Sequence, residues 1–354
     1  MSKKIRIKDI AELAGVSAGT VDRVLHNRGN VSNSSKDAIE SALEKMKYKP
    51  NIHVSALTLK KRYNFVITIP QYSKGQYWES FVKGVQKALD KYEGLEVSIR
   101  YCFYNQFDLF SCRKAFEEVI NCKADAVIIG PTFRDETIYL ANQLSDMNIP
   151  YIYVDSMIEG TSPLAFFIAD PHICGYLMCK LVTHITPKDS GIALFQAMRV
   201  GDESANTTIL RKAGFMSYYN EYELSNKLHK VPYSAVNTEQ NDELIGDFFQ
   251  KNPDVKGAVV LNSRGNIIAD YFRKENIKGV KFICIDLTET NIKALKDNYI
   301  HFIMGQRPDQ QGYMALEAFF QYLIYGKKVK FDNYMPIDII TKENVDLFIN
   351  FNPD

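Results

Sequence analysis

The sequence predicts an α/β protein, with a small helical domain at the N-terminus and a larger body made of two doubly wound, parallel-sheet lobes. Its 354 residues are enough for two or three packing units. Residues 7–46 repeat apolar side chains at helical spacing. From residue 63 onward, short apolar runs alternate with amphipathic stretches, which is the pattern of βαβ units.

The composition is typical of a folded globular protein. The chain is 46% hydrophobic and 24% charged, and no apolar run approaches the ~20 residues that a membrane-spanning helix needs. Residues 1–6 are basic but no apolar stretch follows them, so we expect no secretory signal and a cytoplasmic location. Six cysteines, at positions 102, 112, 122, 174, 179 and 284, lack the spacing of metal ligands. We expect reduced core thiols, with no metal site and no disulfide framework.

Charge is divided unevenly along the chain. Residues 1–62 carry thirteen Lys and Arg against six Asp and Glu, which gives this segment a net charge of +7. Because the whole chain has a net charge of +1, the remainder carries −6. A basic N-terminal domain on an acidic body indicates that the domain, and not the body, binds a polyanion.

The N-terminal domain has the pattern of three short helices. Residues 7–14 form one apolar helical stripe, and Gly15-Val16 then ends the helix. Ser17 is a natural N-cap for a second helix that runs to about residue 25, and Ser32 can cap a third. A tight glycine turn between the first two of three helices is typical of a helix-turn-helix domain, which we place at residues 1–49. A three-helix bundle without a ligand would give the same pattern.

A longer sequence pattern distinguishes a helix-turn-helix domain from a three-helix bundle without a ligand. Residues 7–11 (IKDIA) and 14–25 (AGVSAGTVDRVL), followed by Val31-Ser32 and by KYKPN at 47–51, resemble the lactose/galactose repressor (LacI) family. The resemblance implies that residues 17–25 form the recognition helix in the DNA major groove. It also implies this set of DNA contacts: Ser17, Ala18, Gly19, Thr20, Arg23, His26, Asn27, Arg28, Val31, Ser32, Asn51 and Leu57.

Two departures from the family pattern affect base reading. Ala18 and Gly19 are too small for the bidentate contacts that carry most direct readout. Asp22 stands where the family has a small hydroxyl residue and brings a negative charge near the DNA backbone. We therefore expect Arg23 to make more of the contacts that recognise bases. The competing interpretation of Arg23 is a salt bridge to Asp22 or Glu12.

Residues 50–62 form a linker with too little apolar surface to fold alone. In the resembled family this hinge becomes a helix only in the dimer on DNA, where a leucine wedges into the minor groove and kinks the duplex. Leu57 is the matching residue, whereas Val54 stands where the family usually has alanine. A plain flexible linker is the alternative.

The body should contain two lobes that meet at a ligand cleft. Its apolar runs lie at residues 65–69, 95–101, 126–129, 151–154, 192–195, 258–261, 281–285 and 301–304. These are too many strands for one sheet, and the segment 186–189 falls midway. We place the N-lobe at 63–186 plus 305–335 and the C-lobe at 188–303 plus 336–354, within a body of 63–354. In open sheets of this kind, ligands bind at the carboxyl ends of the strands.

Polar and aromatic residues follow several of these strands. Tyr77 and Trp78 come after the first run, and Asp155, Asn262 and Asp286 each end a later one. Aromatic faces that cover sugar C–H surfaces, with carboxylates and amides for the hydroxyls, are the expected composition of a saccharide cleft. Each residue also has an ordinary interpretation, because Trp78 could be core and a strand-end Asp often caps the next helix.

The body also resembles the periplasmic sugar-binding-protein fold that the LacI family carries, especially its ribose- and inositol-like branch. The residues that carry the likeness are the Tyr77-Trp78 pair, the segment LRKAGF at 210–215 and the string at 306–313. The resemblance implies effector contacts by Tyr77, Trp78, Asp155, Arg211, Asn262, Asp286 and Gln306. Ser263 departs from the family, in which many members have Asp after the Asn.

We therefore expect a homodimeric transcription regulator, a repressor that binds a pseudo-palindromic DNA operator and is released by a small sugar or polyol. We expect no catalytic residues, no cofactor and no membrane partner, since the chain has no phosphate-binding glycine loop and no GxSxG elbow. Three alternatives remain open at this point: a purine- or nucleoside-responsive regulator of the same architecture, a carbohydrate-active enzyme, and an architectural DNA binder.

Overall fold

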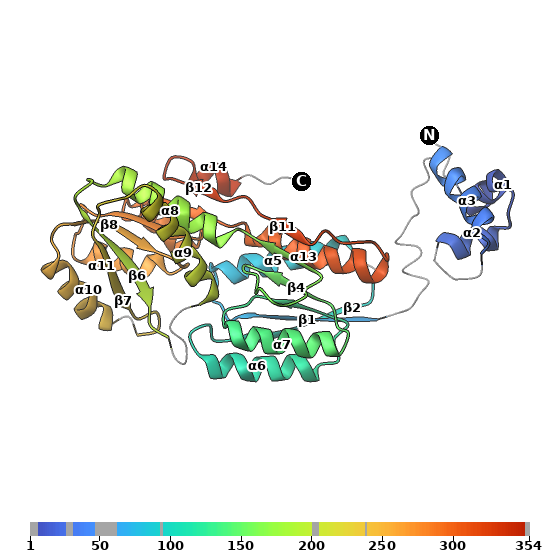
Figure 1. Cartoon of the computed structure of the whole chain (residues 1–354), viewed down its shortest axis with the longest axis horizontal. Coiled ribbons are helices and arrows are strands. Elements are labelled where there is room, and N and C mark those ends of the chain that lie inside the picture. Colours follow the sequence, from blue (N-terminus) through green and yellow to red (C-terminus); the bar gives the residue numbers. More distant parts are fainter. Residues whose placement is uncertain are drawn as a thin grey trace. The chain divides into compact units, whose positions relative to one another are not determined.

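The computed structural model describes residues 6–25, 31–46, 62–92, 95–199, 205–237 and 239–350. Two compact units make up the chain: the first consists mainly of residues 1–62, and the second begins at Tyr63. Figure 1 shows the helices of the first unit and the two sheets of the second.

The first unit contains the three predicted helices, α1 (Ile7–Ala14), α2 (Ala18–Leu25) and α3 (Asn33–Lys45). Their core is formed by Ile10, Ala11, Val21, Ile39 and Ala42. Gly15 ends α1 with a φ of 66°, a left-handed conformation that glycine adopts at little cost. The predicted caps are present, since Ser17 Oγ accepts the N–H of Thr20 at 3.1 Å and Ser32 Oγ accepts that of Ser35 at 3.3 Å.

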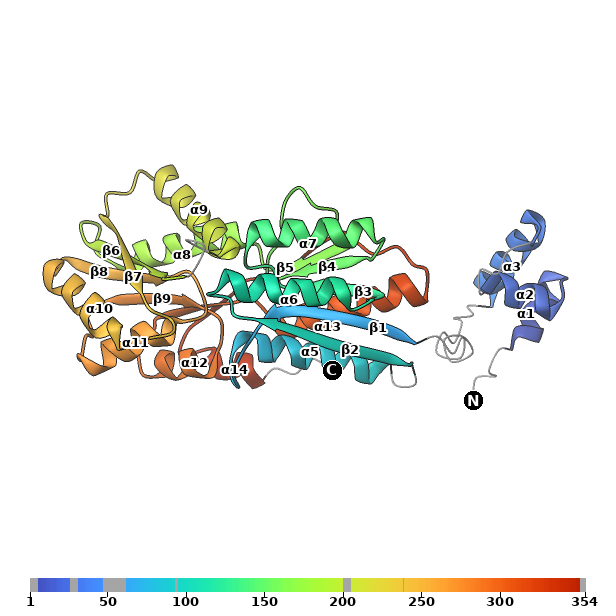
Figure 2. The ribbon, with the colours of Figure 1, turned by 90° about the horizontal axis from the view of Figure 1, so that it is seen from below.

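The first lobe of the body is a six-stranded parallel sheet in the order β11-β5-β4-β3-β1-β2. Its strands are β1 (Tyr63–Pro70), β2 (Val97–Tyr104), β3 (Ala126–Ile129), β4 (Tyr151–Val154), β5 (Ala165–Ile168) and β11 (Asp332–Tyr334). Helices α5 (Tyr77–Lys91) and α13 (Pro308–Phe319) cover one face, and α6 (Leu109–Asn121) and α7 (Arg134–Asp146) cover the other (Figure 1). Figure 2 views the body from the side of α6 and α7.

The second lobe is a six-stranded sheet in the order β12-β10-β9-β8-β6-β7, in which only β12 runs antiparallel. Its strands are β6 (Gly191–Ala197), β7 (Leu228–Tyr233), β8 (Val255–Val260), β9 (Lys281–Ile285), β10 (Phe302–Gly305) and β12 (Asp338–Ile340). Its helices are α8 (Pro171–Ile185), α9 (Asn206–Glu221), α10 (Gln240–Lys251), α11 (Gly265–Lys274), α12 (Glu289–Lys296) and the short α14 (Val345–Asn350). One core packs α8 and α9 against the sheet, and a second packs α10, α11 and α12 against its other face.

The chain crosses between the lobes three times. It passes from β5 to α8 near Asp170, from β10 to α13 through Gln306 and Arg307, and from β11 to β12 near Met335. The predicted fold class, two doubly wound lobes after a three-helix N-terminal domain, is confirmed. All three crossings lie at the same junction, so residues around it can respond to movement of one lobe against the other.

Two expectations from composition can be compared with the described residues. All six cysteines are unpaired, and five of them are buried, as expected for core thiols. Within the ranges that the structure describes, none of the helices has the length and apolar character of a membrane span.

Close glycine crossings fix the helices that border the junction. A Cβ at Gly84 of α5 would lie 1.8 Å from the main-chain oxygen of Asp309 of α13. In the second lobe, a Cβ at Gly214 of α9 would lie 1.8 Å from the main-chain oxygen of His172 of α8. Both pairs of helices therefore pack backbone against backbone, which leaves little freedom in where their first turns point.

We expect Gly214→Ala to lower the free energy of unfolding by about 1–3 kcal/mol, because the added methyl group meets a main-chain oxygen that cannot move aside easily. Gly279→Ala is the matched control, since Gly279 is exposed and an added Cβ there would have no heavy atom within 4 Å. Urea unfolding measures both. Equal midpoints and slopes for the two variants would contradict the close crossing.

Candidate functional site

A cavity lies between the two lobes of the body. The space that atoms leave empty there, open solvent included, amounts to about 640 Å³. Its wall is formed by strand-end residues and first helical turns from both lobes: Pro70, Tyr77, Trp78, Gln106, Phe107, Thr132, Asp155, Gln196, Ala197, Arg199, Ala205, Thr207, Thr208, Arg211, Asn262, Ser263 and Asp286. A molecule inside it would contact both lobes at once.

Six of the seven residues that the resemblance assigned to effector binding are in this wall: Tyr77, Trp78, Asp155, Arg211, Asn262 and Asp286. The seventh, Gln306, is 1% exposed and lies behind the wall, where its amide contacts two of the six. The structure thus brings the predicted set together, with Gln306 as a support for other residues.

Several wall residues were not predicted from the sequence. Gln106 and Gln196 follow or end strands β2 and β6, so the strand-end rule could have found them. Thr207 and Thr208 lie in the first turn of helix α9, and no periodic pattern in the sequence marks them.

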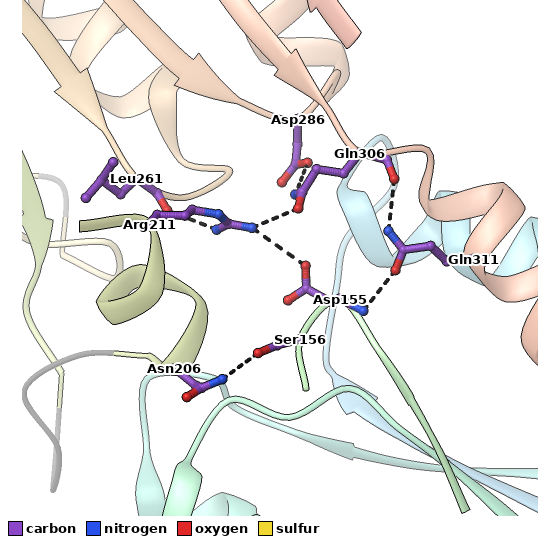
Figure 3. Close-up of polar contacts among 8 residues, drawn as sticks. All are labelled: Asp155, Ser156, Asn206, Arg211, Leu261, Asp286, Gln306 and Gln311. Atoms are coloured by element: carbon purple, nitrogen blue, oxygen red, sulfur yellow. Dashed lines mark hydrogen bonds and ion pairs between the residues drawn. The ribbon is translucent and has the colours of Figure 1, made fainter. Parts of the chain in front are cut away.

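Arg211 is a buried cation of the site that contacts three other segments of the body. It projects from α9 and is 3% exposed. Its Nη1 donates to the main-chain oxygen of Leu261 at 3.0 Å, its Nη2 donates to Gln306 Oε1 at 2.8 Å, and Nη2 lies 3.8 Å from Asp155 Oδ1 (Figure 3). A buried charge is tolerated only when it is paired and hydrogen-bonded. The guanidinium therefore ties α9 to the end of β8, to the second crossing and to a carboxylate of the first lobe.

Asp155 and Asp286 occupy equivalent places in the two lobes, directly after β4 and β9. Both are left-handed, with φ of 66° and 71°, which for a residue with a side chain stores on the order of 1–3 kcal/mol of strain. Figure 3 shows both carboxyl groups turned toward the Arg211–Gln306 pair, and Asp286 Oδ1 accepts Gln306 Nε2 at 2.7 Å. Such strain persists where surrounding contacts hold the residue in place, which is common in binding sites.

Burial controls the protonation of these acids. It raises the pKa of Asp286 to about 7, although Arg211 and the bond from Gln306 act in the opposite direction. Burial also raises the pKa of Asp155, which Arg211 and Tyr77 partly offset. The hydroxyl of Tyr77 lies beside Asp155, and its own pKa is raised by burial and by both carboxylates. Near neutral pH the cavity can thus exchange a proton at Asp286.

Two buried glutamines connect the site to the second crossing. Gln311 Oε1 accepts the main-chain N–H of Asp155 at 2.8 Å, and Gln311 Nε2 donates to the main-chain oxygen of Gln306 at 2.9 Å (Figure 3). Both glutamines are at most 1% exposed. A shift of Asp155 therefore reaches the crossing strand through a chain of hydrogen bonds.

Asn291 performs a similar task within the second lobe. It is fully buried, and its Nδ2 lies 3.0–3.1 Å from the main-chain oxygens of Ser263, Ile285 and Asp286. It holds the ends of β8 and β9 together beneath the cavity wall. Asn262 and Asp286 consequently share one rigid support.

The lobes also touch each other at the edge of the cavity. The amide of Asn206, at the start of α9, donates to Ser156 Oγ (Figure 3). Its main-chain N–H donates to the main-chain oxygen of Thr132 at 3.1 Å. At another point Glu289 N–H donates to the oxygen of Gly75 at 3.1 Å. In this structure the two lobes of the body are therefore in direct contact.

Trp78 combines the two roles that the sequence left open. It is 7% exposed and packs edge-on against Tyr77 and Phe81, with ring centroids at 4.9 and 5.5 Å. A Cβ at Gly130 would lie 2.5 Å from its ring, so the indole fits a space that only glycine leaves open. Most of the ring is core, and the remainder is an apolar surface in the cavity wall.

The predicted DNA contacts in the first unit are described only in part. Ser17, Gly19 and Arg23 are exposed on or beside α2, and Ala18 and Thr20 are half-buried. Ser32 is exposed and Val31 is half-buried. The other members of the set lie outside the described residues: His26, Asn27, Arg28, Asn51 and Leu57. On the helix that was predicted to read DNA, Gly19 and Arg23 are therefore exposed.

The described ranges contain no group of three or more His, Cys, Asp or Glu that could hold a metal ion. The cavity wall instead offers two carboxylates, two arginines, amides and hydroxyls. These groups suit a ligand with many hydroxyls.

Comparison with known proteins identifies the family. Residues 6–51 match the model for bacterial regulatory proteins of the lacI family, and residues 65–328 match that for a periplasmic binding protein domain. The crystal structure of a candidate LacI transcriptional regulator from Bacteroides fragilis is 31% identical, has a TM-score of 0.77, and covers 81% of this chain and 99% of that one. The chain belongs to the LacI family.

Two further comparisons show how far the likeness of this LacI-family chain extends. DegA of Bacillus subtilis, an HTH-type transcriptional regulator, is 34% identical over 50% of this chain and 51% of its own length. The alignment thus spans about half the length of that curated relative. GanP, a glucose-galactose binding protein from Geobacillus stearothermophilus, has a TM-score of 0.71 at 20% identity and covers 81% of this chain and 99% of that one, which shows a shared fold for the body.

We expect Asp286→Asn to change how stability depends on pH. In the wild type, the buried carboxyl holds its proton up to a pKa of about 7, whereas in the unfolded chain it loses the proton near pH 4. The native state therefore binds more protons between these values, and its free energy of unfolding falls as pH rises, by about 2 kcal/mol from pH 5 to pH 7. The Asp286→Asn variant has no carboxyl group to titrate, so its free energy of unfolding should not fall in this way. Compared with the wild type, it should therefore be more stable at pH 8 than at pH 5.

Urea unfolding at pH 5, 6, 7 and 8 measures the difference. Asp135→Asn is the control, because the Asp135 side chain is 90% exposed and its removal should leave the pH profile of the wild type unchanged. A profile of Asp286→Asn that runs parallel to the wild type would show that Asp286 is ionised throughout.

Proposed function

We propose that this LacI-family chain is a DNA-binding transcription regulator whose operator affinity is controlled by a small sugar or sugar-like molecule bound between the lobes. The observation that carries the proposal is the polar cavity in which Arg211 of one lobe meets Asp155 of the other. The helix-turn-helix unit at the start of the same chain supplies a DNA-binding element. Binding in the cavity and binding to DNA are then two functions of one polypeptide.

A sugar fits the chemistry of the wall. Asp155 and Asp286 accept hydrogen bonds from hydroxyls, Arg211 and Asn262 offer donors, and Tyr77 and Trp78 provide apolar ring surface. The name of GanP as a glucose-galactose binding protein is consistent with such a ligand for this fold. A nucleoside would also use the aromatic surface, but two carboxyl groups that accept hydrogen bonds from hydroxyls when ionised favour a ligand rich in hydroxyls.

Control of DNA binding would pass through the lobe junction. A ligand that bridges Asp155 and Asp286 favours one arrangement of the lobes over others, and this differential affinity is the source of any coupling. Gln306 and Gln311 would carry the shift to the first lobe, to which the linker attaches. We assign residues 1–49 to DNA binding, 50–62 to the hinge and 63–354 to the ligand-binding body, with Leu57 as the minor-groove wedge.

The regulator is proposed to act as a homodimer. Two copies related by a two-fold axis present two helix-turn-helix units, which is the arrangement that a pseudo-palindromic operator requires. Repression that the sugar relieves is the proposed sign of control. The proposal includes no catalytic step, cofactor or membrane partner.

The test begins with selection of duplex DNA from a random pool by the purified full chain. Operator affinity is then measured by fluorescence anisotropy with and without D-glucose, D-galactose, D-ribose and myo-inositol, and the mass in solution is measured by light scattering. We expect a two-fold symmetric site, a dimer, and at least a tenfold loss of operator affinity with one of the sugars. Failure to enrich any DNA sequence would contradict the proposal of a DNA-binding regulator. Chemical conversion of one of the sugars would favour the alternative of a carbohydrate-active enzyme.

Arg23→Ala should weaken operator binding tenfold or more, because the exposed Arg23 is the side chain of α2 best able to reach base edges or phosphates. Anisotropy titrations at several salt concentrations measure the change, including any reduction in the salt slope. Arg134→Ala is the matched control: Arg134 is a half-exposed arginine of α7 in the body, and its loss should leave operator affinity unchanged. Equal affinities for the two variants would remove Arg23 from the DNA contacts.

A further inference from the structure

We propose that Tyr233 is a positioning residue that fixes the side-chain amide of Asn262 as a hydrogen-bond donor toward the cavity. The sugar atom in front of Asn262 must then be an acceptor. This inference rests on the proposed function, since it concerns how the same cavity selects its ligand.

The orientation of Asn262 follows from its two hydrogen bonds. Its Oδ1 lies 2.9 Å from the main-chain nitrogen of Arg264 and 2.9 Å from the hydroxyl of Tyr233. A main-chain N–H can only donate, so the side-chain atom that faces it must be the amide oxygen. With the oxygen held between these two donors, the amino group of Asn262 is left for the cavity, whose wall this residue forms.

Tyr233 is suited to hold this oxygen without contacting the ligand. It ends strand β7, is 0% exposed, and is not part of the cavity wall. Burial raises the pKa of its hydroxyl, so the group keeps its proton near neutral pH and can donate it to Asn262. A flipped Asn262 would place its NH₂ group against the main-chain N–H of Arg264, and that hydrogen bond and the one that Tyr233 donates would both have to be given up.

The consequence is a directional wall in the second lobe. Asn262 and the neighbouring Arg211 present only donors, while Asp286 in its ionised form presents only acceptors. The wall therefore favours one orientation of a bound sugar. In this orientation an oxygen with a free lone pair faces Asn262, and a hydroxyl that can donate faces Asp286. A ligand with an ammonium group at the first position would be rejected, because its donors would have no acceptor there.

A double-mutant cycle tests whether Tyr233 acts through Asn262. Calorimetric titration of the full chain with D-glucose, D-galactose, D-ribose and myo-inositol first identifies the sugar that binds the wild type most tightly. With that sugar, we expect Tyr233→Phe to lower affinity about tenfold and Asn262→Ala to lower it further. The double variant should bind as weakly as Asn262→Ala alone, because Tyr233 has nothing left to orient.

Tyr153→Phe controls for the loss of a buried hydroxyl. Tyr153 is also 0% exposed and its hydroxyl bonds Thr161 at 3.1 Å, outside the cavity wall. This variant should lose thermal stability to a similar extent while it keeps the affinity of the wild type. If both Tyr variants keep full affinity, or if the losses of Tyr233→Phe and Asn262→Ala multiply, the inference is overturned.

Asn262→Asp tests the donor itself. The aspartate keeps an oxygen for Tyr233 and Arg264, so the local structure is retained, but the atom that faces the cavity becomes an acceptor. We expect a loss of affinity at least as large as that of Asn262→Ala, and binding at the wild-type level would overturn the inference. If no sugar of the panel binds even the wild type, the proposed function fails first and the inference falls with it.

Discussion

Burial of the Arg211 guanidinium is the constraint on which the rest of the site depends. Only 3% of the residue is exposed, so hydration cannot stabilise its charge and oxygens of the protein must do so. These oxygens come from Leu261, Gln306 and Asp155, which belong to the end of β8, the second crossing and the first lobe. One side chain therefore specifies how three distant segments meet. The left-handed Asp155 lies at one of these contacts, and the glycine crossing of α8 with α9 holds the helix that carries Arg211.

The same constraint explains why the cavity is sensitive to what fills it. Asp286 sits close enough to share Gln306 with Arg211, yet burial still raises its pKa to about 7. Its charge is only partly compensated, so hydroxyl donors from a ligand would stabilise the ionised form. Gln306 and Gln311 connect this charge to the crossing and to Asp155, so one chain of hydrogen bonds runs from the cavity to the junction between the lobes.

Much of this arrangement could be predicted from the sequence, for identifiable reasons. Asp155, Asn262 and Asp286 follow short apolar runs, and parallel strands bring their carboxyl ends to one edge. Arg211 lies in the middle of a helix, where only resemblance to a family marks it. Strand β7 escaped prediction because it is an edge strand with alternating exposure and contains Pro232, which a central strand would exclude. Tyr233 could not be assigned a role, since its partner Asn262 is 29 residues away and meets it only in the folded lobe.

The most direct test of this coupling is the ratio of operator affinities with and without the sugar that binds, measured for the full chain and for its Arg211→Lys variant. Lysine keeps the positive charge for Asp155 but cannot bond Leu261 and Gln306 as a planar guanidinium does. We expect the variant still to bind the operator, with a ratio that falls to one. A variant that keeps both the operator affinity and the ratio of the wild type would contradict the central role of Arg211.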